Sequence, residues 1–177
     1  YRPLEVLPPV TINPSEKVYV FGDTKPKQIT LRIRANAPNI SGRVEASVTG
    51  GWQVEVKKPE FTLQNKGEEI LVEITTRPEE NAPQGILELS VNIGGVSYNK
   101  SIRRIEYDHI PYQSILSGAE VKLVKVDLKK SSGRNNIGYI QGAGDDVPAS
   151  LKQIGYNVTI LTDDMLLNDD LSKYDAI

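Results

Sequence analysis

The chain has 177 residues, of which 38% are apolar, and its 21 basic and 23 acidic residues give a formal net charge of −2. This length suits one large or two small domains, and because the two signs are mixed along the chain we do not expect nucleic acid as a partner. The lack of cysteine and the single histidine exclude disulfides, thiolate catalysis, cysteine-ligated zinc and a histidine cluster for a metal or a catalytic triad.

Residues 1–107 show the alternating pattern of an all-β domain. In 28–35, apolar residues at the odd positions alternate with polar ones, which predicts one buried and one solvated face. Turns that contain glycine, such as Gly50-Gly51, separate the apolar runs. We therefore predict an immunoglobulin-like (Ig-like) β-sandwich, with strands at 17–21, 28–35, 43–48, 52–57, 69–76, 86–93 and 97–106.

Trp52, the only tryptophan, directly follows the Gly50-Gly51 turn and begins an alternating strand. A large aromatic side chain in this position predicts a core residue that anchors the sandwich. The alternative is a platform on which sugar rings stack, and it requires Trp52 to be exposed beside another aromatic residue such as Tyr98 or Tyr19.

The run Tyr107-Asp108-His109-Ile110-Pro111 predicts the end of the sandwich, because a residue before proline favours an extended backbone. We place a linker at 108–120 and a second domain at 121–177. His109 and Pro111 are interpreted as structural residues. General-base catalysis by His109 would need a nucleophile or a metal that the neighbouring sequence does not offer.

The second domain reads as alternating strands and helices. We predict an edge strand protected by lysines at 121–128. Strands are then predicted at 137–140, 156–161 and 175–177, with helices between them at 147–154 and 162–167. This is a partial α/β fold, a βαβαβ fragment of a flavodoxin-like or glutamine-amidotransferase-like sheet. Since two or three parallel strands cannot cover both faces of a sheet, we expect the fold to continue in a longer protein. Exposed strand edges at 137–140 and 174–177 would then favour a homodimer.

Gly142, Gly144, Asp145 and Asp146 follow the strand at 137–140 and are the candidate ligand-binding residues. Backbone amides at the start of a helix can hold a phosphate, but two carboxylates would repel it and the third glycine of a dinucleotide motif is missing. The alternatives are a substrate pocket at the carboxyl edge of the sheet, and a tight turn that caps the following helix through one of the aspartates.

Two runs carry a resemblance to a known family. Tyr107 to Pro111 and the later run from Ile137 to Pro148 resemble the C-terminal region of large PIG-L (LmbE-like) deacetylases of Bacteroidetes-type bacteria. Gly51-Trp52 and the stretch 82–85 are similar to the Ig-like module associated with secreted α-galactosidases.

The resemblance implies a metal-dependent N-acyl-sugar deacetylase domain before residue 1 and an amidotransferase-like domain that continues past residue 177. It also implies a periplasmic or extracellular location. The family's His-Pro-Asp-Asp metal motif has no counterpart here. We therefore expect no catalytic residue, metal or cofactor in this region, and the missing catalytic domain of its own chain as its partner.

Three hypotheses follow. The first is a non-catalytic accessory or scaffold region of a secreted deacetylase. The second is a carbohydrate-binding module, in which a row of exposed aromatic side chains on the sandwich holds a polysaccharide. The third is a ligand-binding or enzymatic role for the α/β part, with a polar pocket around Asp145 and Asp146. No apolar run approaches the roughly 20 residues of a membrane helix, so we predict no membrane span.

Overall fold

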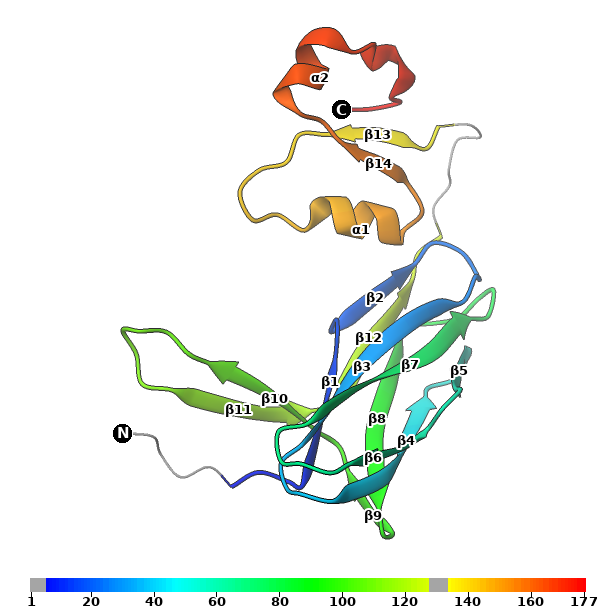
Figure 1. Cartoon of the computed structure of the whole chain (residues 1–177). Coiled ribbons are helices and arrows are strands. Elements are labelled where there is room, and N and C mark those ends of the chain that lie inside the picture. Colours follow the sequence, from blue (N-terminus) through cyan, green and yellow to red (C-terminus); the bar gives the residue numbers. More distant parts are fainter. Residues whose placement is uncertain (1–5, 128–133) are drawn as a thin grey trace.

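Two β-sheets pack face to face in the computed structural model, which describes residues 6–127 and 134–177 (Figure 1). The four-stranded sheet has the order β1-β3-β7-β5 and the six-stranded sheet the order β2-β12-β8-β4-β6, with β9 paired to β8. Neighbouring strands are antiparallel except for β2 and β12, which are parallel. The strands of the first sheet are β1 (Val10–Pro14), β3 (Lys27–Ala35), β7 (Glu69–Pro78) and β5 (Trp52–Val56). Those of the second are β2 (Val18–Phe21), β12 (Glu120–Lys125), β8 (Gly85–Ile93), β4 (Ile40–Val48), β6 (Glu60–Leu63) and β9 (Val96–Tyr98).

Alternate residues of both sheets point into one shared core, which confirms the predicted β-sandwich. The largest fully buried side chains are Phe21, Ile12, Ile29, Leu31, Ile33, Leu63, Ile74, Leu87, Leu89, Leu123, Val10 and Val44. Each of them contributes about 1.5–3 kcal/mol by leaving water. The predicted strands between 17 and 93 are all present within a few residues of their predicted bounds, whereas the sequence analysis missed β1 and β6. The strand predicted at 97–106 is divided between β9 and β10.

Residues 108–120, predicted as a linker, contain the turn and the second strand of a hairpin. β10 (Lys100–Ile105) pairs antiparallel with β11 (Gln113–Gly118), and the run from Tyr107 to Pro111 lies at the turn between them. The hairpin projects from the sandwich in Figure 1. The extended backbone that proline favours occurs in strands as well as in linkers. The local sequence does not show whether such a backbone pairs with another strand.

β12 differs from its prediction as an edge strand of the second domain. It lies between β2 and β8 in the six-stranded sheet, with Val121 and Leu123 fully buried. The alternation predicted one buried and one solvated face, but it carries no information about which strands lie on either side. The sandwich therefore extends past residue 107, to Lys125. Leu128, at the end of the predicted strand, and residues 1–5 lie outside the described residues.

The α/β lobe, residues 134–177, contains one β-α-β unit. The strands β13 (Asn136–Tyr139) and β14 (Asn157–Ile160) are parallel, and α1 (Val147–Gln153) connects them. The helix α2 (Asp163–Asn168) and the 3-10 helix η1 (Leu171–Lys173) follow. Within the described residues, the predicted third strand amounts to one isolated parallel bridge between Ile137 and Ala176.

The edge predicted at 137–140 is only partly open. β13 has β14 on one side and the Ala176 bridge on the other, although the side chains of Ile140 and Ile177 are more than half exposed. Association of two chains through these residues stays a prediction.

Candidate functional site

The four candidate ligand-binding residues lie together in the loop before α1, and Asp145 closes that loop on itself. Its carboxylate accepts hydrogen bonds from the main-chain N–H groups of Gly142, over 3.1 Å, and Val147, over 3.3 Å. Gly144 adopts a positive φ of 70°, which glycine tolerates without strain. Asp146 occupies the N-cap position of α1, but its side chain makes no capping hydrogen bond. These contacts are those of a tight turn.

The side chain of Tyr139, at the end of β13, interacts with Asp145 of this loop. Burial, together with the neighbouring Asp145 carboxylate, raises the pKa of the Tyr139 hydroxyl above its ordinary value. A negative charge beside the phenol disfavours the phenolate, because two negative charges close together repel each other.

Trp52 lies in the core and not on a sugar-binding face. Its side chain is 6% exposed, its ring meets that of Phe21 edge to face at 4.9 Å, and its Nε1–H donates to the Pro83 carbonyl over 2.8 Å. Tyr19, one of the aromatic residues proposed beside it, is also buried. The sugar-stacking platform predicted as the alternative for Trp52 is therefore wrong, and the core prediction is confirmed.

His109 and Pro111 lie in the exposed turn between β10 and β11. The His109 ring lies 5.9 Å from the ring of Tyr107. Both residues therefore belong to the β10–β11 hairpin, and neither belongs to the loop between β13 and α1 that contains Asp145.

The end of α1 contacts the end of β2. The N–H of Val20 donates to Oε1 of Gln153 over 3.1 Å, and the Lys27 ammonium donates to the main-chain oxygens of Val20, over 2.6 Å, and of Gln153. A Cβ atom on Gly22 would overlap the Ile154 carbonyl oxygen, so the two backbones are in direct contact. A cation is favourable at a helix C-terminus because the last carbonyl groups have no partner within the helix.

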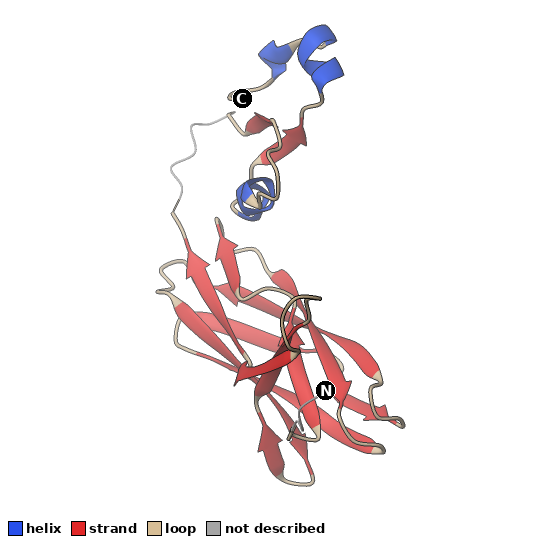
Figure 2. Cartoon of the chain, turned by 90° about the vertical axis from the view of Figure 1, so that its left-hand side faces the viewer, coloured by secondary structure: helices blue, strands red, loops and turns tan. Residues whose placement is uncertain are grey.

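Lys27 is partly withdrawn from water at this contact. Burial lowers the pKa of its ammonium, and the Asp23 carboxylate offsets part of that effect. The ammonium also lies 5.0 Å from the centroid of the Phe21 ring, within the range of a cation–π contact. Lys27, at the start of β3, thus contacts both β2 and the helix of the lobe. Figure 2 shows that helix facing the end of the sandwich.

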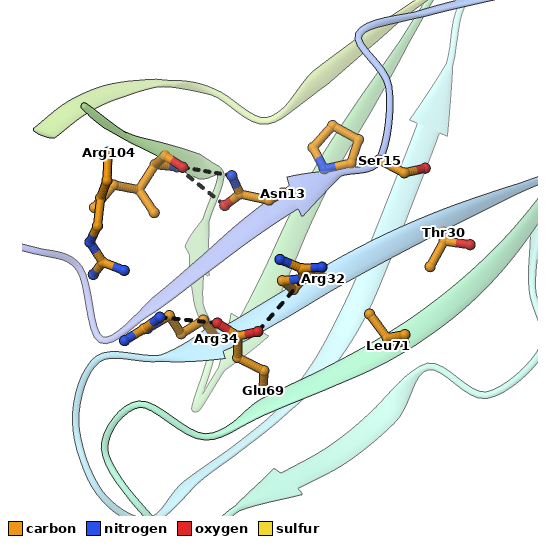
Figure 3. Close-up of a pocket in the computed structure, with 10 residues that line it drawn as sticks. Asn13, Ser15, Thr30, Arg32, Arg34, Glu69, Leu71 and Arg104 are labelled. Carbon is orange, nitrogen blue, oxygen red and sulfur yellow. Dashed lines mark hydrogen bonds and ion pairs between the residues drawn. The ribbon is translucent and has the colours of Figure 1, made fainter. Parts of the chain in front are cut away.

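A groove that the sequence analysis did not predict lies between the outer face of the four-stranded sheet and β10 (Figure 3). Its volume is about 450 Å³. We call it the arginine groove, and it is lined by Asn13, Pro14, Ser15, Thr30, Arg32, Arg34, Glu69, Leu71, Ile102 and Arg104. The alternation in 28–35 correctly placed Arg32 and Arg34 on a solvated face, but nothing local predicted that β10 would bring Arg104 beside them.

Asn13 joins β10 to β1 at the base of this groove. Its side-chain amide donates to the Ile102 carbonyl over 2.6 Å and accepts from the Ile102 N–H over 3.3 Å. The Asn13 side chain thus makes the two hydrogen bonds that a neighbouring strand would make. It pairs both the N–H and the carbonyl of Ile102, which is 7% exposed.

In the parts of the chain that the structure describes, no three His, Asp or Glu side chains are grouped closely enough to hold a metal ion. No helix there has the length and apolar character needed to cross a membrane.

No protein-family model matches the chain, and no curated protein does. Alpha-2-macroglobulin of E. coli in its native conformation is similar at 13% identity and a TM-score of 0.42, over 66% of this chain and 7% of that chain. A FixG-related protein from Vibrio parahaemolyticus is similar at 8% identity and a TM-score of 0.43, over 67% of this chain and 98% of that chain. The cupredoxin domain of amoB from Nitrosocaldus yellowstonii gives 13% identity and a TM-score of 0.35, over 69% and 89%. At these TM-scores the likeness carries no argument about function.

Proposed function

We propose that this chain is a non-catalytic accessory region whose β-sandwich acts as a scaffold for the α/β lobe. The observation that carries the proposal is the contact of β2 and the first residue of β3 with α1, where Val20 and Lys27 both donate hydrogen bonds to Gln153. Gly22 and Ile154 add a backbone contact that leaves no room for a side chain. Such a contact fixes the direction in which the lobe leaves the sandwich.

We also propose that this region belongs to a longer protein of the PIG-L type. The resemblance of the runs at 107–111 and 137–148 to PIG-L deacetylases supports a region that accompanies a metal-dependent N-acyl-sugar deacetylase domain in the periplasm or outside the cell. The catalytic domain of the same protein would then be the partner that the scaffold positions. The assignment of the sandwich as Ig-like and of the α/β lobe as amidotransferase-like is part of this proposal.

The scaffold is tested by the tumbling of the two parts in solution. Amide nitrogen relaxation in the 177-residue chain gives a rotational correlation time for the sandwich and one for the lobe. One shared correlation time is expected, because the contact at Gln153 joins the parts. A distinctly shorter correlation time for the lobe would show that it moves independently and would overturn the scaffold.

The family is tested on the coding sequence and on the protein. We expect a His-Pro-Asp-Asp run with a distant histidine upstream, and no acetate release from N-acetyl sugars by this chain alone with added divalent metal. An upstream glycosidase or adhesin domain would overturn the deacetylase assignment, and acetate release by this chain would overturn the non-catalytic role. Ligand binding around Asp145 and Asp146 stays the alternative prediction for the lobe.

A further inference from the structure

The arginine groove carries an excess of positive charge that the protein does not neutralise. Three arginines line it against one carboxylate, that of Glu69. Glu69 lies between two of them, 3.0 Å from Arg34 and 3.6 Å from Arg32 (Figure 3). Within the described residues, Arg104 has neither an ion pair nor a side-chain hydrogen bond. The groove can therefore accept a further anionic group beside the one it already holds.

Glu69 shows which chemistry the groove suits. A planar guanidinium presents several N–H donors in a fork that matches a carboxylate. Arg32 remains 63% exposed in its side chain despite its contact with Glu69, so a good part of that fork faces solvent. Arg104 lies on the β10 wall of the groove and Arg32 on its floor, so acidic groups that enter the groove meet an arginine on each of these two surfaces.

The floor of the groove favours a sugar over a peptide. β3 lies between β1 and β7, and its backbone groups are used in those two ladders. An extended peptide gains its affinity mainly from main-chain hydrogen bonds at a free strand edge, and this face offers none. The floor instead presents side chains, with the Thr30 hydroxyl for a sugar hydroxyl and the 62% exposed Leu71 for the apolar face of a sugar ring.

We propose that the arginine groove binds an acidic oligosaccharide, with uronic-acid carboxylates held by Arg104 and by Arg32. This site uses no aromatic platform, so it is independent of the buried Trp52. It also goes beyond the scaffold, since the groove lies on the sandwich and contains no residue of the lobe.

Calorimetric titration of the 177-residue chain tests the proposal with oligogalacturonate and oligomannuronate as probes. We expect R104A and R32A each to weaken binding of the acidic probe about tenfold, as the loss of a hydrogen-bonded charged partner does. The control is R103A, which removes the same charge from the neighbouring residue of β10; Arg103 does not line the groove, and its loss should change affinity less than about twofold. R104K, which keeps the charge but not the fork, should lie between wild type and R104A.

Matched probes separate the possible ligands. Methyl-esterified oligogalacturonate has the same sugar ring without the charge, and we expect it not to bind. Binding of the ester as tightly as of the acid, or equal losses in R103A and R104A, would overturn the proposed carboxylate contact. Oligoglutamate that binds as tightly as oligogalacturonate would overturn the assignment to a sugar. Failure of both oligogalacturonate and oligomannuronate to bind would overturn the site.

Discussion

The main-chain N–H of Val20 donates to the side-chain oxygen Oε1 of Gln153, 133 residues further along the chain, over 3.1 Å. Val20 lies on β2, the edge strand of the six-stranded sheet, and Gln153 is the last residue of α1. An edge strand leaves backbone groups without strand partners. In this protein the lobe pairs one of those groups and so becomes attached to the sandwich.

Gly22→Ala should loosen this attachment without unfolding the sandwich. A Cβ atom at position 22 would overlap the Ile154 carbonyl, and because backbone atoms meet there the lobe has to move away. We expect the correlation time of the lobe to fall in amide relaxation while the thermal unfolding of the sandwich changes little. Gly50→Ala is the control, since no atom lies within 4 Å of a Cβ built there. An unchanged correlation time in Gly22→Ala would contradict the contact.

Gly85→Ala should destabilise the sandwich by about 1–3 kcal/mol, the cost of adding an atom to a packed core. The added Cβ would lie 2.7 Å from two atoms of the Trp52 indole, which packs against Phe21 and donates to Pro83. Urea unfolding followed by far-UV circular dichroism measures the change in both this variant and Trp52→Ala, which lacks the only tryptophan of the chain. Trp52→Ala removes the indole and should cost about 3–5 kcal/mol, so a smaller loss there than in Gly85→Ala would contradict this account of the core.

Asn13→Ala should release the base of the β10–β11 hairpin. The substitution leaves the Ile102 N–H and carbonyl without their side-chain partner at a nearly buried position, at a cost of about 1–3 kcal/mol. Hydrogen exchange at the Ile102 amide should accelerate, and proteolysis near the exposed Tyr107 should become faster. Asn81→Ala, on an exposed loop, serves as the control. Equal exchange rates at Ile102 in the two variants would show that Asn13 does not hold the hairpin.

Asp145→Asn should lower the pKa of Tyr139 toward its ordinary value of 10.0, because it removes the negative charge that disfavours the phenolate. In the native chain the raised pKa means that the folded lobe keeps a proton that the unfolded chain loses above pH 10.0. The contribution of Tyr139 to stability is therefore complete below that pH and is lost as the pH rises through the folded value. NMR titration of the Tyr139 ring carbon measures the shift, with Asp146→Asn as the matched control. A pKa that falls equally in both variants would contradict the specific contact.

The sequence determined which face of each strand is buried. The alternation in 28–35 and 86–93 places Ile29, Leu31, Leu87 and Leu89 in the core, because side chains on a strand point alternately to opposite faces whatever lies beside it. Other local signals predicted the buried Trp52, from its large aromatic ring, and the approximate bounds of α1, from the residues typical of helix ends. These are local properties, and each depends on neighbours a few residues away.

Only the tertiary structure decided which strands lie side by side. Alternation is the same for a central strand and an edge strand, so it could not show that β12 joins the sandwich or that residues 113–118 pair with β10. The arginine groove and the contact of Gly22 with Ile154 likewise join residues that are far apart in the chain. Such contacts depend on how whole sheets and helices pack, and that packing is set by the sum of many distant contacts rather than by any single stretch of sequence.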